Sequence, residues 1–197
     1  REVYVQVRNK THLADVFVKP QIHPLQVTTE ITVQNISDGI TLQQEIRKKG
    51  EGAYSPLGQK PVKQTNVQTV FPVQEICLWE PENPHLYEIR TSLWKNGEMI
   101  DARVDITGFR EAGFRKDGFY LNGKKLRLRG LNRHQSYPYV GYAAPASMQI
   151  FDADILKKEL GVNAVRTSHY PQSQDFIRRC DEIGLLVFTE FPGWQHI

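Results

Sequence analysis

The sequence predicts an antiparallel β-sandwich over residues 1–108 and a parallel α/β segment over residues 109–197. Period-two alternation in the first part, strand–helix alternation in the second, and the change of pattern after Gly108 predict this division. The second part has only three expected strands, whereas a closed parallel barrel needs eight strands and roughly 250 residues. The residues therefore predict either the start of a (β/α)8 barrel or a small open sheet.

Apolar and polar residues alternate in several short runs of the first part, as expected for strands with one buried face. These runs cover residues 3–7, 27–33 and, less strictly, 40–46. Asn96-Gly97 separates two further runs and accepts the positive φ angles of a type I′ hairpin turn. Residues 51–68 show little periodicity and predict a long loop. Short strands with regular turns and no helical period are typical of an immunoglobulin-type sandwich.

The second part begins with another Asn-Gly hairpin, Asn122-Gly123, and then alternates strands with helices. The expected order is a strand at 126–131, a helix between Ser147 and Gly161, a strand at 163–165, a helix between Ser173 and Gly184, and a strand at 185–188. Because such crossover connections are right-handed, the three strands should lie in one parallel sheet.

Composition excludes several classes of protein. The chain has 197 residues, a net charge of +3 and 40% hydrophobic residues, which indicates an ordinary globular protein without a membrane span or a nucleic-acid-binding face. Cys77 and Cys180 fall in different halves, so we expect no disulfide framework. The chain opens within a strand-like pattern, and we expect its natural N-terminus to be missing. The cellular compartment is therefore left open.

Polar and aromatic side chains follow each strand of the second part. The carboxyl ends of parallel strands meet at one edge of a sheet, where barrel enzymes place their active sites. Hydrogen-bonding groups together with aromatic rings suit a hydroxyl-rich ligand. The candidates are Asn132, Arg133 and His134 after the first strand, Arg166, His169 and Tyr170 after the second, and Glu190 and Trp194 after the third.

Four separated motifs resemble glycoside hydrolase family 2. Residues 163–171 (NAVRTSHYP) with 180–187 (CDEIGLLV) resemble the family signature, and residues 129–135 (RGLNRHQ) resemble its first barrel strand. Residues 79–87 (WEPENPHLY) resemble late strands of its immunoglobulin-like domain, and 108–110 (GFR) the domain junction. The resemblance implies a fold of an immunoglobulin-like β-sandwich followed by the first strands and helices of an incomplete (β/α)8 TIM barrel.

The resemblance also implies a retaining glycosidase. The Asn-Arg-His-Gln segment and the Pro192-Gly193-Trp194 run look most like β-galactosidases, with a β-glucuronidase or β-mannosidase relative as the alternative. The family's acid/base and nucleophile are glutamates on the fourth and seventh barrel strands. Because neither strand lies within residues 1–197, we assign no catalytic residue and expect the isolated chain to be inactive.

The family pattern implies a role for each candidate. His134, His169, Arg166, Asn132 and Trp194 would bind the sugar, with Arg166 keeping a neighbouring carboxylate ionised. Supporting roles fall to Glu190, Arg133 and Tyr170. The alternatives are histidines satisfied by backbone groups, a structural ion pair between Arg166 and Glu190, and a tryptophan that only closes its loop.

The expected partner is a β-galactoside or related sugar, with no nucleic acid and no membrane. We predict no cofactor and no metal site, although some β-galactosidases of this family hold a metal ion; His196 with Glu190 is too small a ligand set. The unpaired edge of the last strand predicts self-association. A non-catalytic carbohydrate-binding or interaction module is the alternative function.

Overall fold

The computed structural model describes residue 3 and residues 5–192, which form two compact units. One contains the described residues up to Leu78 together with His85–Glu111, and the other contains Trp79–Pro84 and the described residues from Ala112 onward. Across this described part, no helix has the length and apolar character needed to cross a membrane.

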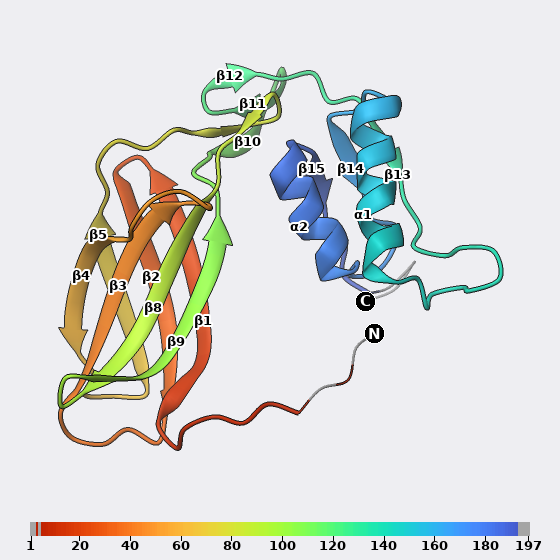
Figure 1. The fold of residues 1–197 in the computed structure, drawn as a ribbon. Coiled ribbons are helices and arrows are strands. Elements are labelled where there is room, and N and C mark those ends of the chain that lie inside the picture. Colours follow the sequence, from red (N-terminus) through yellow and green to blue (C-terminus); the bar gives the residue numbers. More distant parts are fainter. Residues whose placement is uncertain (1–2, 4, 193–197) are drawn as a thin grey trace. The chain divides into compact units, whose positions relative to one another are not determined.

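The first unit is a sandwich of two antiparallel sheets, as predicted (Figure 1). Three strands form one sheet and four form the other. In order across each sheet these are β1 (His12–Ile22), β2 (Leu25–Gln34) and β5 (Asn66–Pro72), then β4 (Ser55–Pro61), β3 (Ile40–Lys48), β8 (Tyr87–Lys95) and β9 (Glu98–Thr107). Alternate residues of both sheets bury their side chains in a shared core, for example Val33, Leu42 and Leu93.

The Asn-Gly turn between β8 and β9 is confirmed. Asn96 and Gly97 have φ angles of 52° and 82°, as a type I′ turn requires, and the flanking strands pair in antiparallel register. The strand at 40–46 is also confirmed, and β3 explains why its alternation looked imperfect. Its buried face runs Ile40, Leu42, Gln44, Ile46, so one of its four buried side chains is polar.

Gln44 is completely buried and links both sheets through hydroxyl groups. Its Nε2 donates to Thr29 Oγ1 and Thr91 Oγ1, each at 3.0 Å, and its Oε1 accepts from Thr69 Oγ1 at 2.6 Å. All three threonines are buried as well. A buried amide is tolerated here because both its nitrogen and its oxygen are hydrogen-bonded.

Gln44→Leu should destabilise the sandwich, because an apolar side chain of similar size leaves three buried hydroxyls without this partner. We expect a loss of about 2–4 kcal/mol in the free energy of unfolding, measured by urea denaturation. Gln43→Leu is the matched control, since the neighbouring side chain is only partly buried and lies on the opposite face; its effect should stay within about 0.5 kcal/mol. Equal losses in the two variants would contradict this explanation.

Two predictions for the sandwich are wrong. Residues 51–68 are not one loop, since they include β4 and the start of β5. Most β4 residues are exposed, so no apolar alternation marks this edge strand. The described residues of 3–7 form no strand; Val3, Val5 and Val7 are almost fully exposed. No described strand pairs with them, and an alternating pattern without a pairing partner does not make a strand.

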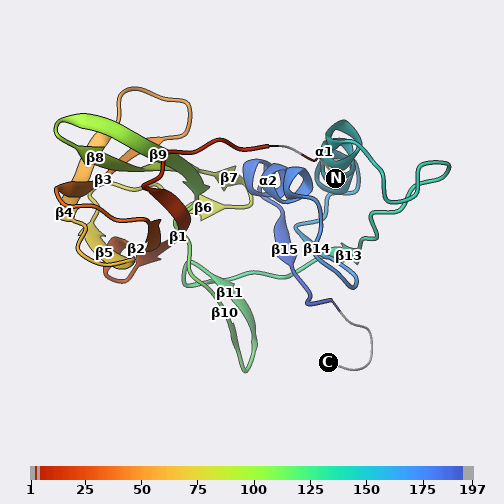
Figure 2. The ribbon, with the colours of Figure 1, turned by 90° about the horizontal axis from the view of Figure 1, so that it is seen from below.

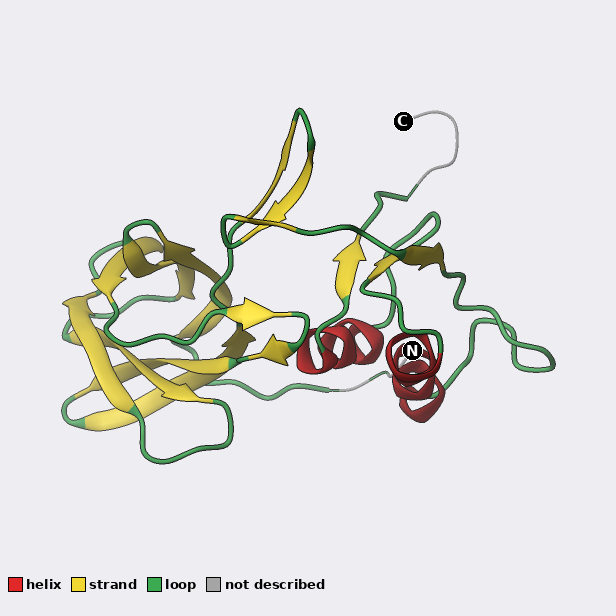
Figure 3. Cartoon of the chain, turned by 90° about the horizontal axis from the view of Figure 1, so that it is seen from above, coloured by secondary structure: helices red, strands yellow, loops and turns green. Residues whose placement is uncertain are grey.

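The second unit contains the predicted parallel sheet. Its strands β13 (Gly130–Asn132), β14 (Ala164–Arg166) and β15 (Leu186–Phe188) lie side by side in that order (Figure 2). Helices α1 (Ala146–Asp154), continued by the π-helical turn η1 (Ile155–Glu159), and α2 (Gln174–Ile183) lie against the same face of the sheet (Figure 3). The expected strand at 126–131 is shorter than predicted, because its pairing starts only at Gly130.

The core of this unit lies between the sheet and the helices. Val165, Leu185, Phe176 and Cys180 are fully or nearly fully buried there. Burial raises the pKa of the Cys180 thiol to about 12, whereas Cys77 in the other unit is exposed; both are free thiols.

The ends of α2 confirm the prediction, but the start of α1 does not. Ser173 caps α2 by accepting from Asp175 N at 3.3 Å, and Gly184 ends the helix with a φ angle of 75°. Helix α1 starts after Pro145, which places Ser147 inside its first turn. Two apolar side chains of this region, Phe151 and Leu160, are exposed.

Three short strands, β10 (Ala112–Arg115), β11 (Gly118–Leu121) and β12 (Lys124–Lys125), form a meander in the same unit. The predicted Asn122-Gly123 turn joins the last two and has φ angles of 50° and 77°. Phe114 and Phe119 pack against Phe188 of β15, with ring centroids 6.2 and 6.3 Å away.

The hairpin of β6 (Trp79–Glu80) and β7 (Asn83–Pro84) also packs in the second unit. The Trp79 indole is fully buried and donates to the Asp181 carbonyl at 2.8 Å. Lys157 Nζ donates to the carbonyls of Pro81 (2.9 Å) and Gly184 (2.8 Å), and burial lowers its pKa. These bonds fasten the hairpin to the C-terminal end of α2.

Candidate functional site

The carboxyl ends of all three parallel strands contribute to one polar cluster. Arg166, the last residue of β14, donates from Nε and Nη2 to Glu190 Oε1 at 2.7 and 2.6 Å. Its Nη1 also lies 3.5 Å from Asn132 Oδ1, at the end of β13. The register explains this meeting, because Asn132 pairs with Arg166 and Arg166 pairs with Phe188, two residues before Glu190.

Glu190 joins this ion pair to an imidazole. Its Oε2 is buried and lies 3.2 Å from His169 Nδ1, but it has no hydrogen bond within the described residues. The contact between Glu190 and His169 is therefore electrostatic, and it strengthens when the imidazole is protonated. The peptide bond before His169 is cis.

Aromatic rings continue the cluster toward solvent. The His134 and His169 rings lie 5.6 Å apart in an edge-to-face arrangement, and His134 lies 6.3 Å from the Tyr170 ring. Tyr170 in turn lies 5.9 Å from Tyr142, which is exposed. The result is a row of four rings from the charged pair to the surface, with His134 itself exposed.

The structure therefore brings together six of the candidates, namely Asn132, His134, Arg166, His169, Tyr170 and Glu190. Trp194 and His196 lie outside the described residues. The ion pair between Arg166 and Glu190 that the sequence left as an alternative is present. The roles of these residues toward a sugar remain predictions.

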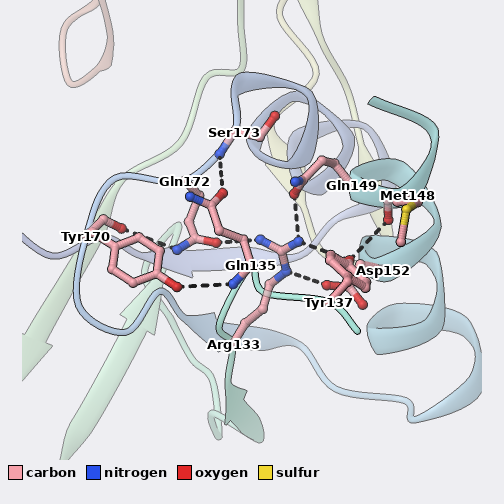
Figure 4. A network of polar contacts seen from close by, with 9 residues as sticks. All are labelled: Arg133, Gln135, Tyr137, Met148, Gln149, Asp152, Tyr170, Gln172 and Ser173. Carbon is pink, nitrogen blue, oxygen red and sulfur yellow. Dashed lines mark hydrogen bonds and ion pairs between the residues drawn. The ribbon is translucent and has the colours of Figure 1, made fainter. Parts of the chain in front are cut away.

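The Arg133 side chain bonds instead to side chains of α1 and to Gln172, just before α2 (Figure 4). Its Nε donates to Asp152 Oδ2 at 2.5 Å, and its Nη2 donates to Gln149 Oε1 at 2.7 Å and reaches Tyr137 Oη at 3.5 Å. Its Nη1 donates to Gln172 Oε1. These four partners were not predicted, although strand alternation already implied that Arg133 and its neighbours face opposite sides.

A metal ligand set is not evident in the described part of the chain, where no three His, Cys, Asp or Glu side chains group suitably. The cluster instead offers hydrogen-bond donors, one carboxylate and aromatic surface. Such an arrangement can hold hydroxyl groups and stabilise charge.

Family models match nearly the whole chain. Residues 11–110 match the model described as glycosyl hydrolases family 2, and residues 113–197 match the model for the TIM barrel domain of the same family. The chain belongs to glycosyl hydrolase family 2. Its first unit is the family's immunoglobulin-like domain, and its second contains the start of the family's TIM barrel. The parallel sheet is therefore the start of a barrel, not a small open sheet.

Similar family 2 proteins are known from bacteria. A β-galactosidase of Thermoanaerobacter pseudethanolicus is 44% identical over the whole chain, and one of Thermoanaerobacterium thermosulfurigenes is 57% identical over 70% of it. The chain spans 27% and 19% of these two relatives. Among solved structures, an FMN-binding β-glucuronidase from Facaelibacterium prausnitzii matches 94% of this chain with 30% of its own, at a TM-score of 0.80 and 32% identity.

Proposed function

We propose that this chain supplies the immunoglobulin-like domain and part of the sugar-binding rim of a retaining hydrolase that removes terminal β-galactosides. The observation that carries the proposal is the cluster of Asn132, His134, Arg166, His169 and Glu190 at the carboxyl ends of three barrel strands. In barrel enzymes this is the end where substrates bind.

The cluster fits substrate binding better than bond cleavage. A retaining glycosidase needs two carboxyl groups about 5–5.5 Å apart, one as nucleophile and one as acid/base. Within the described residues Glu190 is the one carboxylate of the cluster, and Arg166 already holds it in an ion pair. We therefore assign Glu190 a supporting role and leave the catalytic pair to barrel strands outside this chain. His134, His169 and Asn132 would bond to sugar hydroxyls.

Two observations favour a galactoside over a glucuronide. The similar β-galactosidases are 44% and 57% identical to this chain, compared with 32% for the solved β-glucuronidase. In addition, Glu190 balances the charge of Arg166, which weakens the attraction of this guanidinium for a sugar carboxylate. A neutral sugar fits such a site better. The β-glucuronidase remains the second candidate because the fold matches it closely.

The test is hydrolysis by the complete protein encoded by the gene. We expect release of nitrophenol from p-nitrophenyl β-D-galactoside, with little release from the glucuronide or the mannoside. NMR of the first-formed sugar should show the β-anomer. The isolated 197-residue chain should show no turnover, because we assign both catalytic carboxylates to barrel strands outside it. Turnover by the isolated chain would contradict our assignment of the catalytic pair, and preference for the glucuronide would establish the second candidate.

A complete protein that binds galactose but cleaves none of these substrates would indicate the non-catalytic module instead.

Self-association of the isolated chain remains a prediction, because β13 and β15 each pair with only one described neighbour. Analytical ultracentrifugation of the chain would test it.

A further inference from the structure

We propose that Arg133 is a positioning residue of the site: its buried side chain fixes where His134 and His169 stand. This inference rests on the proposed function, since it concerns the same cluster. The described hydrogen bonds of the Arg133 side chain go to Asp152, Gln172, Gln149 and Tyr137, none of which belongs to the cluster. Arg133 acts through the backbone of its neighbours Asn132 and His134, and through residues 170–173, which follow β14.

The burial of Arg133 is the first reason. The residue is 4% exposed, and its guanidinium stacks 3.8 Å above the ring of Phe176 in α2. All three of its nitrogens donate hydrogen bonds, and Asp152 of α1 balances its charge. The free energy lost by desolvating a buried ion pair is about as large as the free energy gained from its electrostatic attraction. An apolar residue of similar size would therefore stabilise the packing equally well. A buried, fully bonded guanidinium instead fixes one geometry.

The position of Arg133 between Asn132 and His134 is the second reason. Side chains alternate along extended backbone, so holding Arg133 toward the helices turns both neighbours toward the cluster. The Arg133 backbone N–H also donates to the Arg166 carbonyl at 2.8 Å, which continues the pairing of β13 with β14 past the last strand residue. The side chain and the backbone of Arg133 thus fix the same strand end.

Bonds between the two histidine-bearing segments are the third reason. Arg133 Nη1 donates to the side chain of Gln172, three residues after His169. On the other side of His134, Gln135 N donates to Tyr170 Oη at 3.2 Å, and Gln135 Oε1 accepts from Ser173 N at 3.1 Å (Figure 4). The residue before His134 and the residue after it are therefore both hydrogen-bonded to the segment 170–173. This holds the two imidazoles at their 5.6 Å separation.

The chain offers a matched control in Arg179. This arginine of α2 also bonds to acidic groups, Asp154 at 2.9–3.2 Å and Glu182 at 3.2 Å, and it also links α2 to α1. Unlike Arg133, it does not adjoin a strand of the parallel sheet and makes no described bond to the segments that carry the histidines. Removing it tests the loss of a helix–helix ion pair alone.

The experiment compares Arg133→Met, Arg133→Lys and Arg179→Met in the complete protein with p-nitrophenyl β-D-galactoside. Because a misplacement of about 1 Å can cost 10²-fold in rate, we expect Arg133→Met to lower kcat by about 100-fold while KM changes by less than about threefold. Arg133→Lys should recover part of the loss. Arg179→Met should keep kcat/KM within about threefold of wild type even if its Tm falls.

Two results would overturn the inference: a folded Arg133→Met protein with wild-type kcat, or an Arg179→Met protein with an equal loss. If Arg133→Met does not fold, Gln172→Leu replaces it. This change removes the Nη1 bond and the 3.3 Å bond from Gln172 Nε2 to the Tyr170 carbonyl, but it leaves the bonds of Arg133 to Asp152 and Gln149 in place; kcat should then fall by about tenfold. An unchanged kcat there would overturn the inference as well. A wild-type protein that cleaves no galactoside would overturn the proposed function, and the positioning role with it.

Discussion

Arg166→Met should lower kcat/KM of the complete protein toward a β-galactoside by about 100-fold or more, because it removes the centre of the strand-end cluster. Arg166 holds Glu190 through two nitrogens at 2.6 and 2.7 Å and reaches Asn132 at 3.5 Å. Without the guanidinium, a partly buried carboxylate loses its countercharge, and His169 would remain its only ionisable neighbour among the described residues of the cluster. Steady-state kinetics on a chromogenic galactoside measures the effect.

The sandwich unit provides a closely matched control. Arg90 donates to Glu45 Oε2 from Nε at 2.7 Å and Nη2 at 2.6 Å, the same geometry as the Arg166 pair, but within β8 and β3. Arg90→Met should therefore leave kcat/KM within about threefold of wild type. The kcat/KM of Arg166→Lys should lie between those of these two variants, because lysine keeps the positive charge but cannot donate two parallel hydrogen bonds to Glu190. Similar losses for Arg90→Met and Arg166→Met would show that the ion pair only stabilises the fold.

Gly184→Ala should strongly destabilise the second unit. Gly184 ends α2 with a φ angle of 75°, a conformation that costs other residues about 1–2 kcal/mol. A Cβ atom there would also lie 2.0 Å from the carbonyl oxygen of Pro81, so the β6–β7 hairpin would have to move. We expect a total loss of about 3–5 kcal/mol, because the hairpin's bonds to Lys157 and Trp79 would be disturbed too.

Gly161→Ala separates the two causes of this loss. Gly161 follows η1 with a φ angle of 64°, but a Cβ atom added to it would meet nothing within 4 Å. Its substitution should cost about 1 kcal/mol, the conformational part alone. Thermal unfolding, together with hydrogen exchange of the α2 amides, measures both variants. Equal losses of stability in the two variants would mean that the Pro81 carbonyl moves away from the added methyl group without a measurable change in free energy.

The sequence by itself determined the local elements whose signals are carried by neighbouring residues. The Asn-Gly turns at 96–97 and 122–123, the Ser173 cap and the Gly184 stop depend on backbone conformations that few residue types accept, so their positions could be read directly. The rim residues could be named for a similar reason, because parallel strands must end at one edge.

The sequence was misleading where the signal depends on a distant partner. Val3, Val5 and Val7 alternate like a strand but pair with no described strand, whereas β4 pairs well with β3 without an apolar pattern. Gln44 interrupts an apolar face, yet it is buried because threonines on three other strands satisfy its amide. Pairing and burial of this kind are properties of the assembled sheets.

The same division holds for the site. The sequence placed Arg133 and Arg166 at adjacent strand ends and suggested the pairing of Arg166 with Glu190, and it gave Arg133 a supporting role without naming its partners. Only the tertiary structure showed that Arg133 turns into the helices, where Asp152 and Gln172, 19 and 39 residues further along the chain, receive its hydrogen bonds. A guanidinium is buried only where acceptors surround it, and the folded chain alone brings those acceptors together.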